Sequence, residues 1–394
     1  MSRLSELLSL PDREKQDKGV LHTPGEIVQQ PETWRRTFEL FKARQAEIQA
    51  FVTKNRSNGH NGNPTVILTG AGTSDFVGQS LAHLIRRQWR CQALAIASTN
   101  LLTHLDSFVI AGNKYLCVSF SRSGDSPEGV AVVERLLDCY TNVFHLVVTC
   151  SEQGALARRY SGHPGVCCLV LDKATNDKGL AMTSSYSNMV VAGQCLAHLS
   201  DLGSYSAVLS QLVTRGEGFL EVAAATAEQL ARESYRKICF LGSGALFGVA
   251  RESALKVLEL TAGRVCTFAE TYLGLRHGPL SAIDKETLLV GFLSSHAQCR
   301  AYELDLLEEI RAKALARKRV VIACEPETRL SGWVDHHLIP AGDSPLPDEY
   351  RPPLDVMFGQ LLGLFASLEH GLLPDSPSPS GVIARIVGKI KIYS

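Results

Sequence analysis

The chain has 394 residues, of which 45% are hydrophobic and 20% charged, and its 40 basic residues balance 40 acidic ones. This composition is typical of a globular protein, and without a concentrated basic face we expect no nucleic-acid partner. No stretch approaches the roughly eighteen consecutive apolar residues of a membrane helix, so we expect no membrane partner. The segment Met1 to Val20 is polar and charged, which is not the pattern of a signal peptide.

The cysteines indicate a reducing compartment. Eleven of them are scattered along the chain, only Cys167 and Cys168 are adjacent, and no Cys-x-x-Cys occurs. An odd, unpatterned set in a chain of this length is typical of reduced and mostly buried thiols. We therefore expect a cytoplasmic protein without structural zinc.

The first part of the chain predicts a helical extension ahead of a core. Residues 1–23 are weakly patterned, and we expect them to be frayed or peripheral. From about Glu32 to Lys54, Trp34, Phe38, Phe41 and Ile48 recur near helical spacing. Residues 55–63 are rich in Asn and Gly and predict a loop.

Strands and helices then alternate. Short apolar runs predict strands at 66–68, near 96, and at 115–120, 144–149 and 166–171. Helical patterns cover 75–88, 127–139, 183–199, 205–232, 245–261 and about 354–370. Pro127 stands just inside its helix, as expected at a helix start, and Gly263 follows the helix that ends near Thr261. This alternation predicts an α/β fold with parallel sheets.

The two halves of this pattern match each other. Residues 66–72 (VILTGAG) correspond to 238–244 (ICFLGSG), 115–120 to 287–292, and 144–150 to 317–324. An internal repeat of this kind predicts two tandem doubly wound parallel-sheet domains. We place a helical extension at 1–55, the first domain at 56–205, the second at 206–372, and a tail at 373–394 that closes the active site.

Two loops of the first domain indicate a phosphate site. Thr73 and Ser74 follow the first strand, and Ser121-Arg122-Ser123-Gly124-Asp125-Ser126 follows the strand at 115–120. Ligands of parallel sheets bind at the carboxyl ends of strands, where hydroxyl groups and free backbone N–H groups suit an anion. Helix capping alone also explains a single Ser or Thr. A run of this length exceeds what one cap needs, so phosphate binding is favoured.

A dinucleotide is the rival ligand for such a loop. Gly70-Ala-Gly72 lacks the third glycine of the fingerprint, because Asp75 stands in its place, and no acidic residue ends the next strand near Ile96. Gly242-Ser-Gly244 has its next glycine, Gly248, one residue late. An isolated Gly-x-Gly is weak evidence, so we expect no nucleotide cofactor.

The helix at 245–261 carries a row of charges. Glu252, Lys256 and Glu259 fall at i, i+4 and i+7 and therefore share one face. Spacing alone favours the interpretation that these residues form a solvent-exposed ladder of ion pairs, rather than that they line an active site. The segment beyond shifts this balance, because His277 stands in a Gly-Pro turn shortly after Glu270, and histidine is a residue type suited to proton transfer.

Four motifs, in the same order and spacing, resemble the sugar isomerase (SIS) family. They are Gly70-Ala-Gly-Thr-Ser74, Ser121-Arg-Ser-Gly-Asp-Ser126, Arg251-Glu-Ser-Ala-Leu-Lys-Val-Leu-Glu-Leu260 and Leu275-Arg-His-Gly-Pro-Leu-Ser-Ala-Ile-Asp284. Over nearly its whole length the chain is similar to the bacterial deaminase/isomerases of galactosamine 6-phosphate, and less closely to the isomerase half of glucosamine-6-phosphate synthase. The resemblance implies a flavodoxin-like fold for each domain.

The resemblance also implies roles. Glu259 is the proton-shuttling base, Lys256 and Glu252 accompany it, and His277 opens the sugar ring in the neighbouring subunit's site. The phosphate contacts fall on Thr73, Ser74, Ser121, Arg122, Ser123 and Ser126, and we expect sugar contacts from Gly72, Thr183, Ser184 and Arg385. Arg122 replaces a glutamine of the synthases, and Ala181-Met-Thr-Ser-Ser185 replaces their Ala-Ser-Thr-Lys. The first replacement adds a charge beside the phosphate, and the second weakens the expectation of a contact from that segment.

These roles imply a cytoplasmic enzyme that converts galactosamine 6-phosphate to tagatose 6-phosphate and ammonia. No cofactor or metal is expected, and the shared site implies a homodimer or a dimer of dimers. Three alternatives stay open: a non-deaminating isomerase of tagatose or galactose 6-phosphate, a deaminase of glucosamine 6-phosphate, and a phosphosugar-sensing regulator. The last would need a DNA-binding domain, for which the residues before Val66 are too few and insufficiently basic.

Overall fold

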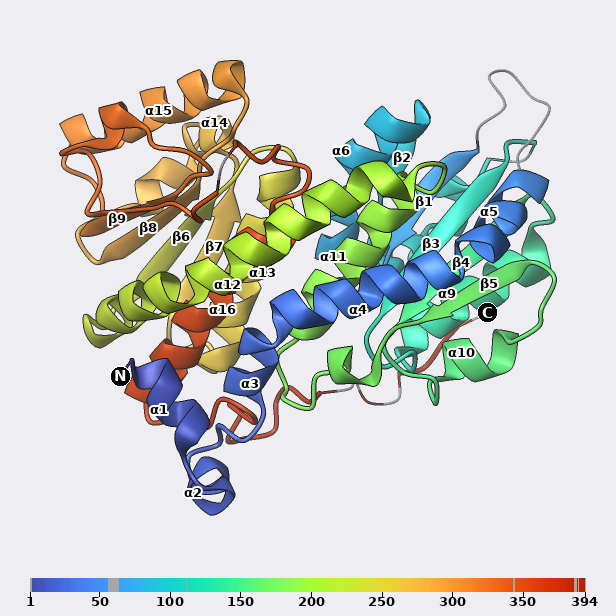
Figure 1. Ribbon diagram of the computed structural model, residues 1–394, viewed down its shortest axis with the longest axis horizontal. Helices are drawn as coiled ribbons and strands as arrows, with labels where there is room; N and C mark the ends of the chain where they lie inside the picture. Colours follow the sequence, from blue (N-terminus) through green and yellow to red (C-terminus); the bar gives the residue numbers. More distant parts are fainter. Residues whose placement is uncertain are drawn as a thin grey trace. The chain divides into compact units, whose positions relative to one another are not determined.

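The protein was analysed as a computed structural model, which describes residues 2–55, 64–110, 112–342, 344–385, 388 and 390–393 (Figure 1). The chain forms two compact units. The first-sheet unit comprises Glu32–Asn176, Ser184–Leu209 and Ala384–Ser394, and the second-sheet unit comprises Met1–Pro31, Asp177–Thr183 and Ser210–Ile383. Each unit is assembled from three separate stretches of the chain. The domain boundaries at residues 55, 205 and 372, which were expected from the sequence for continuous segments, stay a prediction.

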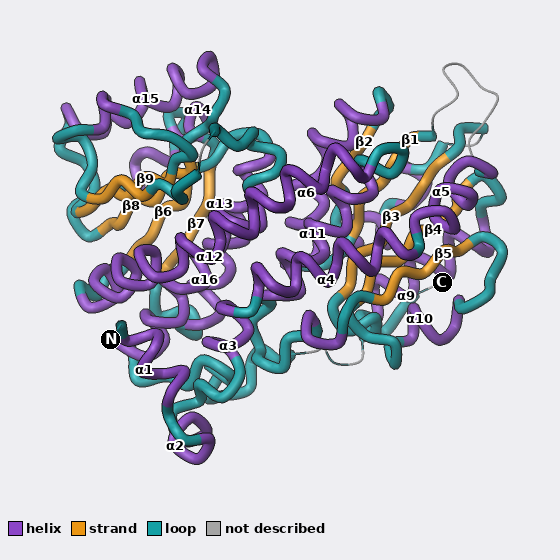
Figure 2. The backbone as a smooth tube through the Cα atoms, in the orientation of Figure 1, coloured by secondary structure: helices purple, strands orange, loops and turns teal. Residues whose placement is uncertain are grey.

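The first-sheet unit contains a five-stranded parallel sheet in the order β2-β1-β3-β4-β5 (Figure 2). Its strands are β1 (Thr65–Thr69), β2 (Ala93–Ala95), β3 (Tyr115–Ser121), β4 (Val143–Thr149) and β5 (Val166–Val170). Its helices are α4 (Gln30–Ala43, from Glu32 on), α5 (Gln45–Lys54), α6 (Thr73–Trp89), α7 (Ser98–Thr103), α8 (Leu105–Phe108), α9 (Pro127–Cys139), α10 (Ala155–Tyr160), α11 (Ser184–Ala197) and the start of α12 (Leu202–Arg232).

The second-sheet unit contains a second five-stranded parallel sheet, β10-β9-β8-β6-β7. Its strands are β6 (Lys237–Leu241), β7 (Cys266–Glu270), β8 (Thr287–Phe292), β9 (Lys318–Ile322) and β10 (His336–Leu338). Its helices are α1 (Arg3–Ser9), α2 (Asp12–Asp17), α3 (Thr23–Val28), most of α12, α13 (Ala245–Leu260), α14 (Tyr272–Leu275), α15 (Ala297–Ala312) and α16 (Pro352–Glu369).

The two sheets have the same topology. The strands of each unit can be numbered 1 to 5 in chain order. In both sheets the strands then lie side by side in the order 2-1-3-4-5, so β1 corresponds to β6 and β3 to β8. The turn after the first strand is also the same: Gly72 has φ 57° and ψ −125°, and Gly244 has φ 57° and ψ −126°. A side chain would be strained in this conformation, which explains both glycines. The predicted tandem doubly wound parallel sheets are confirmed.

Helices cover both faces of the first sheet, so its strands are largely apolar rather than alternating. Every residue of β3 and β4 is buried. Ile67 packs with Leu101 of α7 and Val132 of α9 on one face. The next residue, Leu68, points to the other face, where Gly78 of α6 lies so close that an added Cβ would stand 3.0 Å from the Leu68 Cβ.

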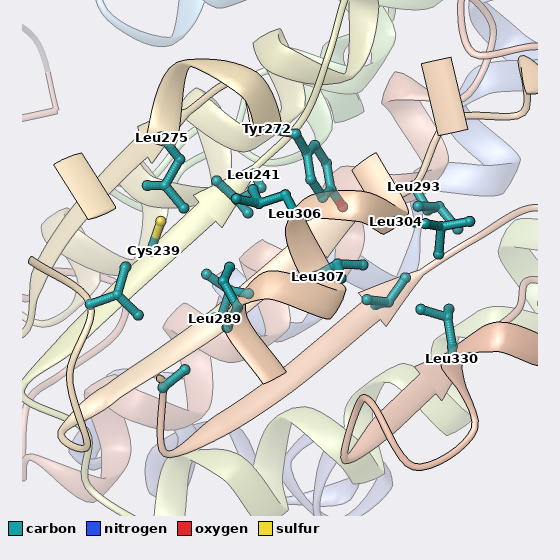
Figure 3. Close-up of a cluster of buried hydrophobic side chains, with 14 of the residues drawn as sticks. Cys239, Leu241, Tyr272, Leu275, Leu289, Leu293, Leu304, Leu306, Leu307 and Leu330 are labelled. Atoms are coloured by element: carbon teal, nitrogen blue, oxygen red, sulfur yellow. The ribbon is translucent and has the colours of Figure 1, made fainter. Parts of the chain in front are cut away.

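The second sheet is covered in the same way. On one face, Leu241, Leu289 and Val321 from three neighbouring strands pack against α14 and α15. Figure 3 shows Tyr272 and Leu275 from α14 and Leu304, Leu306 and Leu307 from α15 in this core. On the other face α13 lies across β6, β7 and β8, and α16 packs against α13. The charged row of α13 is therefore held on a helix fixed from two sides.

The beginning of the chain is more ordered than its pattern indicated. The expectation of a frayed segment at 1–23 was wrong, because α1 and α2 form there and Leu4, Leu7 and Val20 are buried. The helix expected from Glu32 to Lys54 is two helices, which separate at Arg44. The loop predicted at 55–63 lies, apart from its first residue, outside the described residues.

Within the described residues, no helix is long and apolar enough to cross a membrane. None of the eleven cysteines, all of which fall in that part of the chain, forms a disulfide.

Candidate active site

The hydroxyl-rich loops lie at one edge of the first sheet. β1 and β3 are adjacent and parallel, with Thr69 paired to Ser119, so the loops that follow them emerge side by side. Thr73 and Ser74 open α6 behind Gly72 and are buried. Ser121 is the last residue of β3 and is 6% exposed. This is the arrangement predicted for the phosphate site.

Hydrogen bonds within the loop set its shape and leave donors for a ligand. The Ser121 Oγ accepts the Gly124 N–H at 3.0 Å, and the Ser123 Oγ accepts the Asp125 N–H at 3.1 Å. Because both oxygens act as acceptors, both hydroxyl protons can be donated to an anion. Ser126, in contrast, donates its proton to the Glu128 Oε2 at 3.0 Å, so it is less suited to a phosphate contact than predicted.

A third loop supports the first two. Gly154 precedes α10 and lies against residues 121–126, the predicted phosphate loop. An added Cβ would stand 2.2 Å from the Ser123 carbonyl oxygen. The Leu156 N–H donates to the Gly124 carbonyl at 3.0 Å, and the Ala155 N–H donates to the Asp125 carboxylate at 2.8 Å. The sequence reasoning missed Gly154. A glycine in the loop after β4, at the same sheet edge, was the available signal.

Arg122 and Arg385 are in contact, although 263 positions separate them in sequence. The Arg122 Nη2 donates to the Arg385 main-chain carbonyl at 2.5 Å, and the Arg385 Nη2 donates to the Asn176 Oδ1 at 2.6 Å. Arg122 is 6% exposed, so its guanidinium is held rather than solvated. The predicted sugar contact Arg385 therefore belongs to the phosphate-loop region, with Asn176 as a partner that the sequence did not reveal.

The charged row of α13 is an interior feature. The Lys256 Nζ lies 3.5 Å from the Glu252 Oε1 and 2.6 Å from the Glu259 Oε2. The side chains of Glu252 and Lys256 are 0% and 1% exposed, whereas that of Glu259 is 24% exposed. The exposed ladder favoured by spacing alone is excluded, since buried charges of this kind are held only by partners. Of the three groups, only Glu259 reaches the surface of its unit.

Close packing fixes the backbone of this helix. Gly359 of α16 has no room for a side chain, because an added Cβ would stand 2.4 Å from the Ser253 Cβ. One turn later, a Cβ on Gly363 would stand 3.1 Å from the Lys256 carbonyl oxygen. The two glycines let α16 approach α13, and they determine where the charged row lies.

His277 lies just beyond α14 and its side chain is exposed. Its N–H donates to the Gly274 carbonyl at 2.9 Å, and Gly278 behind it has φ 121°, which favours glycine. Tyr272, which precedes it, is fully buried in the core and has a structural role.

The remaining predicted residues are divided between the units. Thr183 is buried in the second-sheet unit, where its N–H and hydroxyl both donate to the Asp177 carboxylate at 2.8 and 3.1 Å. Ser184 is buried at the start of α11 in the first-sheet unit, and its carbonyl accepts the Asn188 amide at 2.8 Å. The phosphate-loop residues thus lie on one unit, and the α13 row with His277 on the other.

No group of three or more His, Cys, Asp or Glu side chains among the described residues could hold a metal ion. His336 and His337 lie on the edge strand β10 and are half-buried.

A doubly wound parallel sheet of this order, with hydroxyl-rich loops at the carboxyl ends of adjacent strands, defines a ligand-binding class of α/β protein. A family model, the SIS domain, matches residues 232–343. A D-galactosamine-6-phosphate deaminase, AgaS, from Escherichia coli is 35% identical over 372 residues, which cover 94% of this chain and 95% of that protein. The chain therefore belongs to the SIS family, in the group of the galactosamine-6-phosphate deaminases.

Solved structures agree with this assignment. The crystal structure of a tagatose-6-phosphate ketose/aldose isomerase from Escherichia coli has a TM-score of 0.84 and 34% identity, covering 92% of this chain and 95% of that one. The C-terminal domain of a glucosamine-fructose-6-phosphate aminotransferase from Francisella tularensis has a TM-score of 0.75 at 19% identity, covering 90% and 98%. The second likeness shows the shared fold alone.

Proposed function

We propose that this protein is a D-galactosamine-6-phosphate deaminase, an enzyme that isomerises a 2-amino aldose 6-phosphate and releases its amine as ammonia. The similarity to the Escherichia coli deaminase over almost the whole length of both chains supports the substrate class. No cofactor enters this proposal, because the chemistry needs only proton transfer and the addition of water.

One observation supports the assignment of the base: Glu259 alone of the buried row is accessible, and the Lys256 ammonium donates to it at 2.6 Å. A general base must reach the substrate and must be held in one orientation. Glu259 satisfies both requirements. Lys256 orients it, and Glu252 balances the buried lysine from the preceding turn.

The proposed reaction begins with ring opening. His277 moves a proton between the ring oxygen and the anomeric hydroxyl to release the aldehyde. Glu259 then removes the proton from C2 and returns it to C1, while one proton passes from the amine to the aldehyde oxygen, so that the aldehyde becomes a C1 hydroxymethyl group and the amine a C2 imine. Water adds to this imine, ammonia leaves, and the ketose tagatose 6-phosphate remains. The phosphate, held by Ser121 and Ser123, orients the reacting carbons.

Incubation with galactosamine 6-phosphate alone tests the proposal, with ammonia followed by a coupled assay. We expect ammonia without added glutamine, and a Glu259→Gln variant should lose about 10²–10⁴-fold in kcat while it still binds the phosphorylated sugar. Glu308→Gln, at an exposed position of α15 in the same unit, is the matched control. Full activity of Glu259→Gln would contradict the assignment of the base.

The structural relative from Escherichia coli named as a tagatose-6-phosphate ketose/aldose isomerase supports a second candidate function. The same base and phosphate loop would then interconvert sugars that carry no amine. Ketose formation from galactose 6-phosphate, with no ammonia from either galactosamine or glucosamine 6-phosphate, would favour that function. If ammonia forms from glucosamine 6-phosphate and not from galactosamine 6-phosphate, the enzyme is still a deaminase but its substrate is glucosamine 6-phosphate.

The proposal includes a homodimer, or a dimer of dimers, in which His277 acts on a substrate held by the other subunit. The exposed position of His277 on its own unit is compatible with such a role. Mixing Glu259→Gln and His277→Ala subunits by co-refolding places both changes in one site of each heterodimer and leaves the other site intact. Activity should return to at most half of the parent value, and verified heterodimers without recovery would place His277 in its own subunit's site.

The absence of disulfides among the eleven cysteines supports a cytoplasmic location.

A further inference from the structure

The loop of the second sheet that corresponds to the predicted phosphate loop has fewer hydroxyl groups, with Ser294 and Ser295 against Ser121, Ser123 and Ser126. β3 and β8 occupy the same position in their sheets, so Phe120 corresponds to Phe292 and Ser121 to Leu293. The shared glycine turn likewise places Ala245 and Leu246 where the first unit has Thr73 and Ser74. The backbone of the loop, residues 293–296, nevertheless presents its N–H groups at the same strand end.

Two carboxylates of the chain itself occupy this strand end. The Glu303 Oε2 of α15 accepts the Ser294 N–H at 2.7 Å, and the Asp348 Oδ1 accepts the Ser295 N–H at 2.7 Å. The Ser294 hydroxyl donates to the Asp348 Oδ2 at 2.5 Å. Glu303 and Asp348 are 1% and 5% exposed. These are the donors that a bound oxyanion would use, and each is taken by a buried carboxylate.

Further donors complete the arrangement. The Ser243 hydroxyl, in the turn after β6, hydrogen bonds to Glu303, and the Arg351 Nη1 donates to the Asp348 Oδ1 at 3.2 Å. Burial raises the pKa of Glu303, while the hydrogen bonds from Ser243 and the Ser294 N–H lower it. Two amides and two hydroxyls therefore surround the two acids, a set that suits a tetrahedral oxyanion. The Arg351 guanidinium is not counted among them, because it also pairs with the buried Asp355 at 2.7 Å and donates to the Leu293 carbonyl at 2.6 Å.

We propose that the second sheet carries an anion-binding cradle, formed by Ser243, Ser294 and Ser295, that the chain closes with its own carboxylates Glu303 and Asp348. The acids occupy the place of a phosphate and hold the loop in its anion-bound shape. The predicted phosphate site of the first sheet accordingly has no open counterpart at this strand end of the second sheet. Removal of both carboxylates opens a second site for inorganic phosphate or a similar oxyanion. This inference goes beyond the proposed reaction and does not depend on it.

The test removes the first site before it opens the second. In a Ser121→Ala/Ser123→Ala background, titration with inorganic phosphate, followed by ³¹P NMR and calorimetry, should show no site in the cradle. Adding Glu303→Ala and Asp348→Ala should give one site per chain, bound at least tenfold more tightly than by a matched Glu303→Gln/Asp348→Asn protein. The amide side chains of the control keep the cradle filled and remove only the charges.

Circular dichroism verifies that each variant is folded. A folded Ala variant that gains no site overturns the inference, as does phosphate bound in the cradle while both carboxylates are present. If the Ala pair does not fold, Asp348→Ala alone frees the Ser295 N–H and the Ser294 hydroxyl and should give a weaker site, and a folded single variant without one counts against the cradle. No turnover is measured, so failure here leaves the proposed deaminase reaction untouched, and failure of that reaction leaves the cradle testable.

Discussion

Glu26 on α3 is a buried acid whose ionisation should control the stability of the second-sheet unit. Its carboxylate accepts the Lys178 N–H at 2.5 Å and the Gly179 N–H at 3.3 Å, and it is 8% exposed. Burial, with smaller contributions from the charges of Asp177 and Asp375, raises its pKa from 4.5 to about 8, against the effect of the two backbone donors. Glu26 is thus protonated in the folded protein over a range in which it is ionised in the unfolded chain.

The sign of the effect follows from this difference. A group with a raised pKa in the folded state contributes stability that is fully present below pH 4.5 and is lost as the pH rises to about 8. At about 1.4 kcal/mol per pKa unit, and with part of the proton shared with its acidic neighbours, the loss is on the order of 3–5 kcal/mol. Glu26→Gln is neutral throughout, so it should not show this loss.

Urea unfolding of parent and variant between pH 5 and 9, followed by circular dichroism, measures the effect. The two proteins should have similar unfolding free energies at pH 5, and the variant should become the more stable one as the pH rises. Glu6→Gln, at an exposed position of α1 in the same unit, is the control and should track the parent. Parallel stability curves for Glu26→Gln and the parent across this range would refute the reasoning.

Three further perturbations have defined outcomes. Ser121→Ala/Ser123→Ala should raise KM by at least tenfold with a smaller change in kcat, since each charge-assisted hydrogen bond contributes roughly 1.5–3 kcal/mol, and steady-state kinetics decides this. Lys256→Met leaves a buried carboxylate without its ammonium and should lower the unfolding free energy by about 3–5 kcal/mol in urea titrations. Gly359→Ala should push α13 away from α16, lower the unfolding free energy by about 1–3 kcal/mol and affect kcat more than KM. Gly218→Ala on α12, which has open space around it, is the control and should not lower the unfolding free energy.

The sequence could predict the sheets because their strands are buried on both faces. Segments such as Val66–Leu68 and Tyr115–Phe120 are largely apolar and are followed by glycine turns or hydroxyl-rich loops, a pattern that is typical of parallel strands in α/β proteins. The repeat then placed β6 and β8 by analogy. Arg44 shows the limit of such patterns, since the helix breaks there without a proline or glycine, and its guanidinium donates to the distant Cys168 carbonyl at 2.5 Å.

The candidate site was predictable in its residue types and not in its environment. Helical spacing placed Glu252, Lys256 and Glu259 on one face, but spacing is the same for an exposed ladder and a buried row. Only the packing of α16, through Gly359, decides between them. Contacts over long sequence separations, such as Arg122 with Arg385, leave no local pattern at all.

The three-segment composition of the second-sheet unit has a consequence for protein synthesis. The Thr23 N–H and hydroxyl donate to Asp375, 352 positions later, and Arg3 pairs with Glu369, 366 positions later. At roughly 5–20 residues per second, the first helices leave the ribosome about 20–70 s before these partners exist. Through that interval Leu4, Leu7 and Ile27 lack the core that covers them in the finished unit. A nascent chain of this protein therefore needs its N-terminal apolar surface to be shielded until translation is nearly complete.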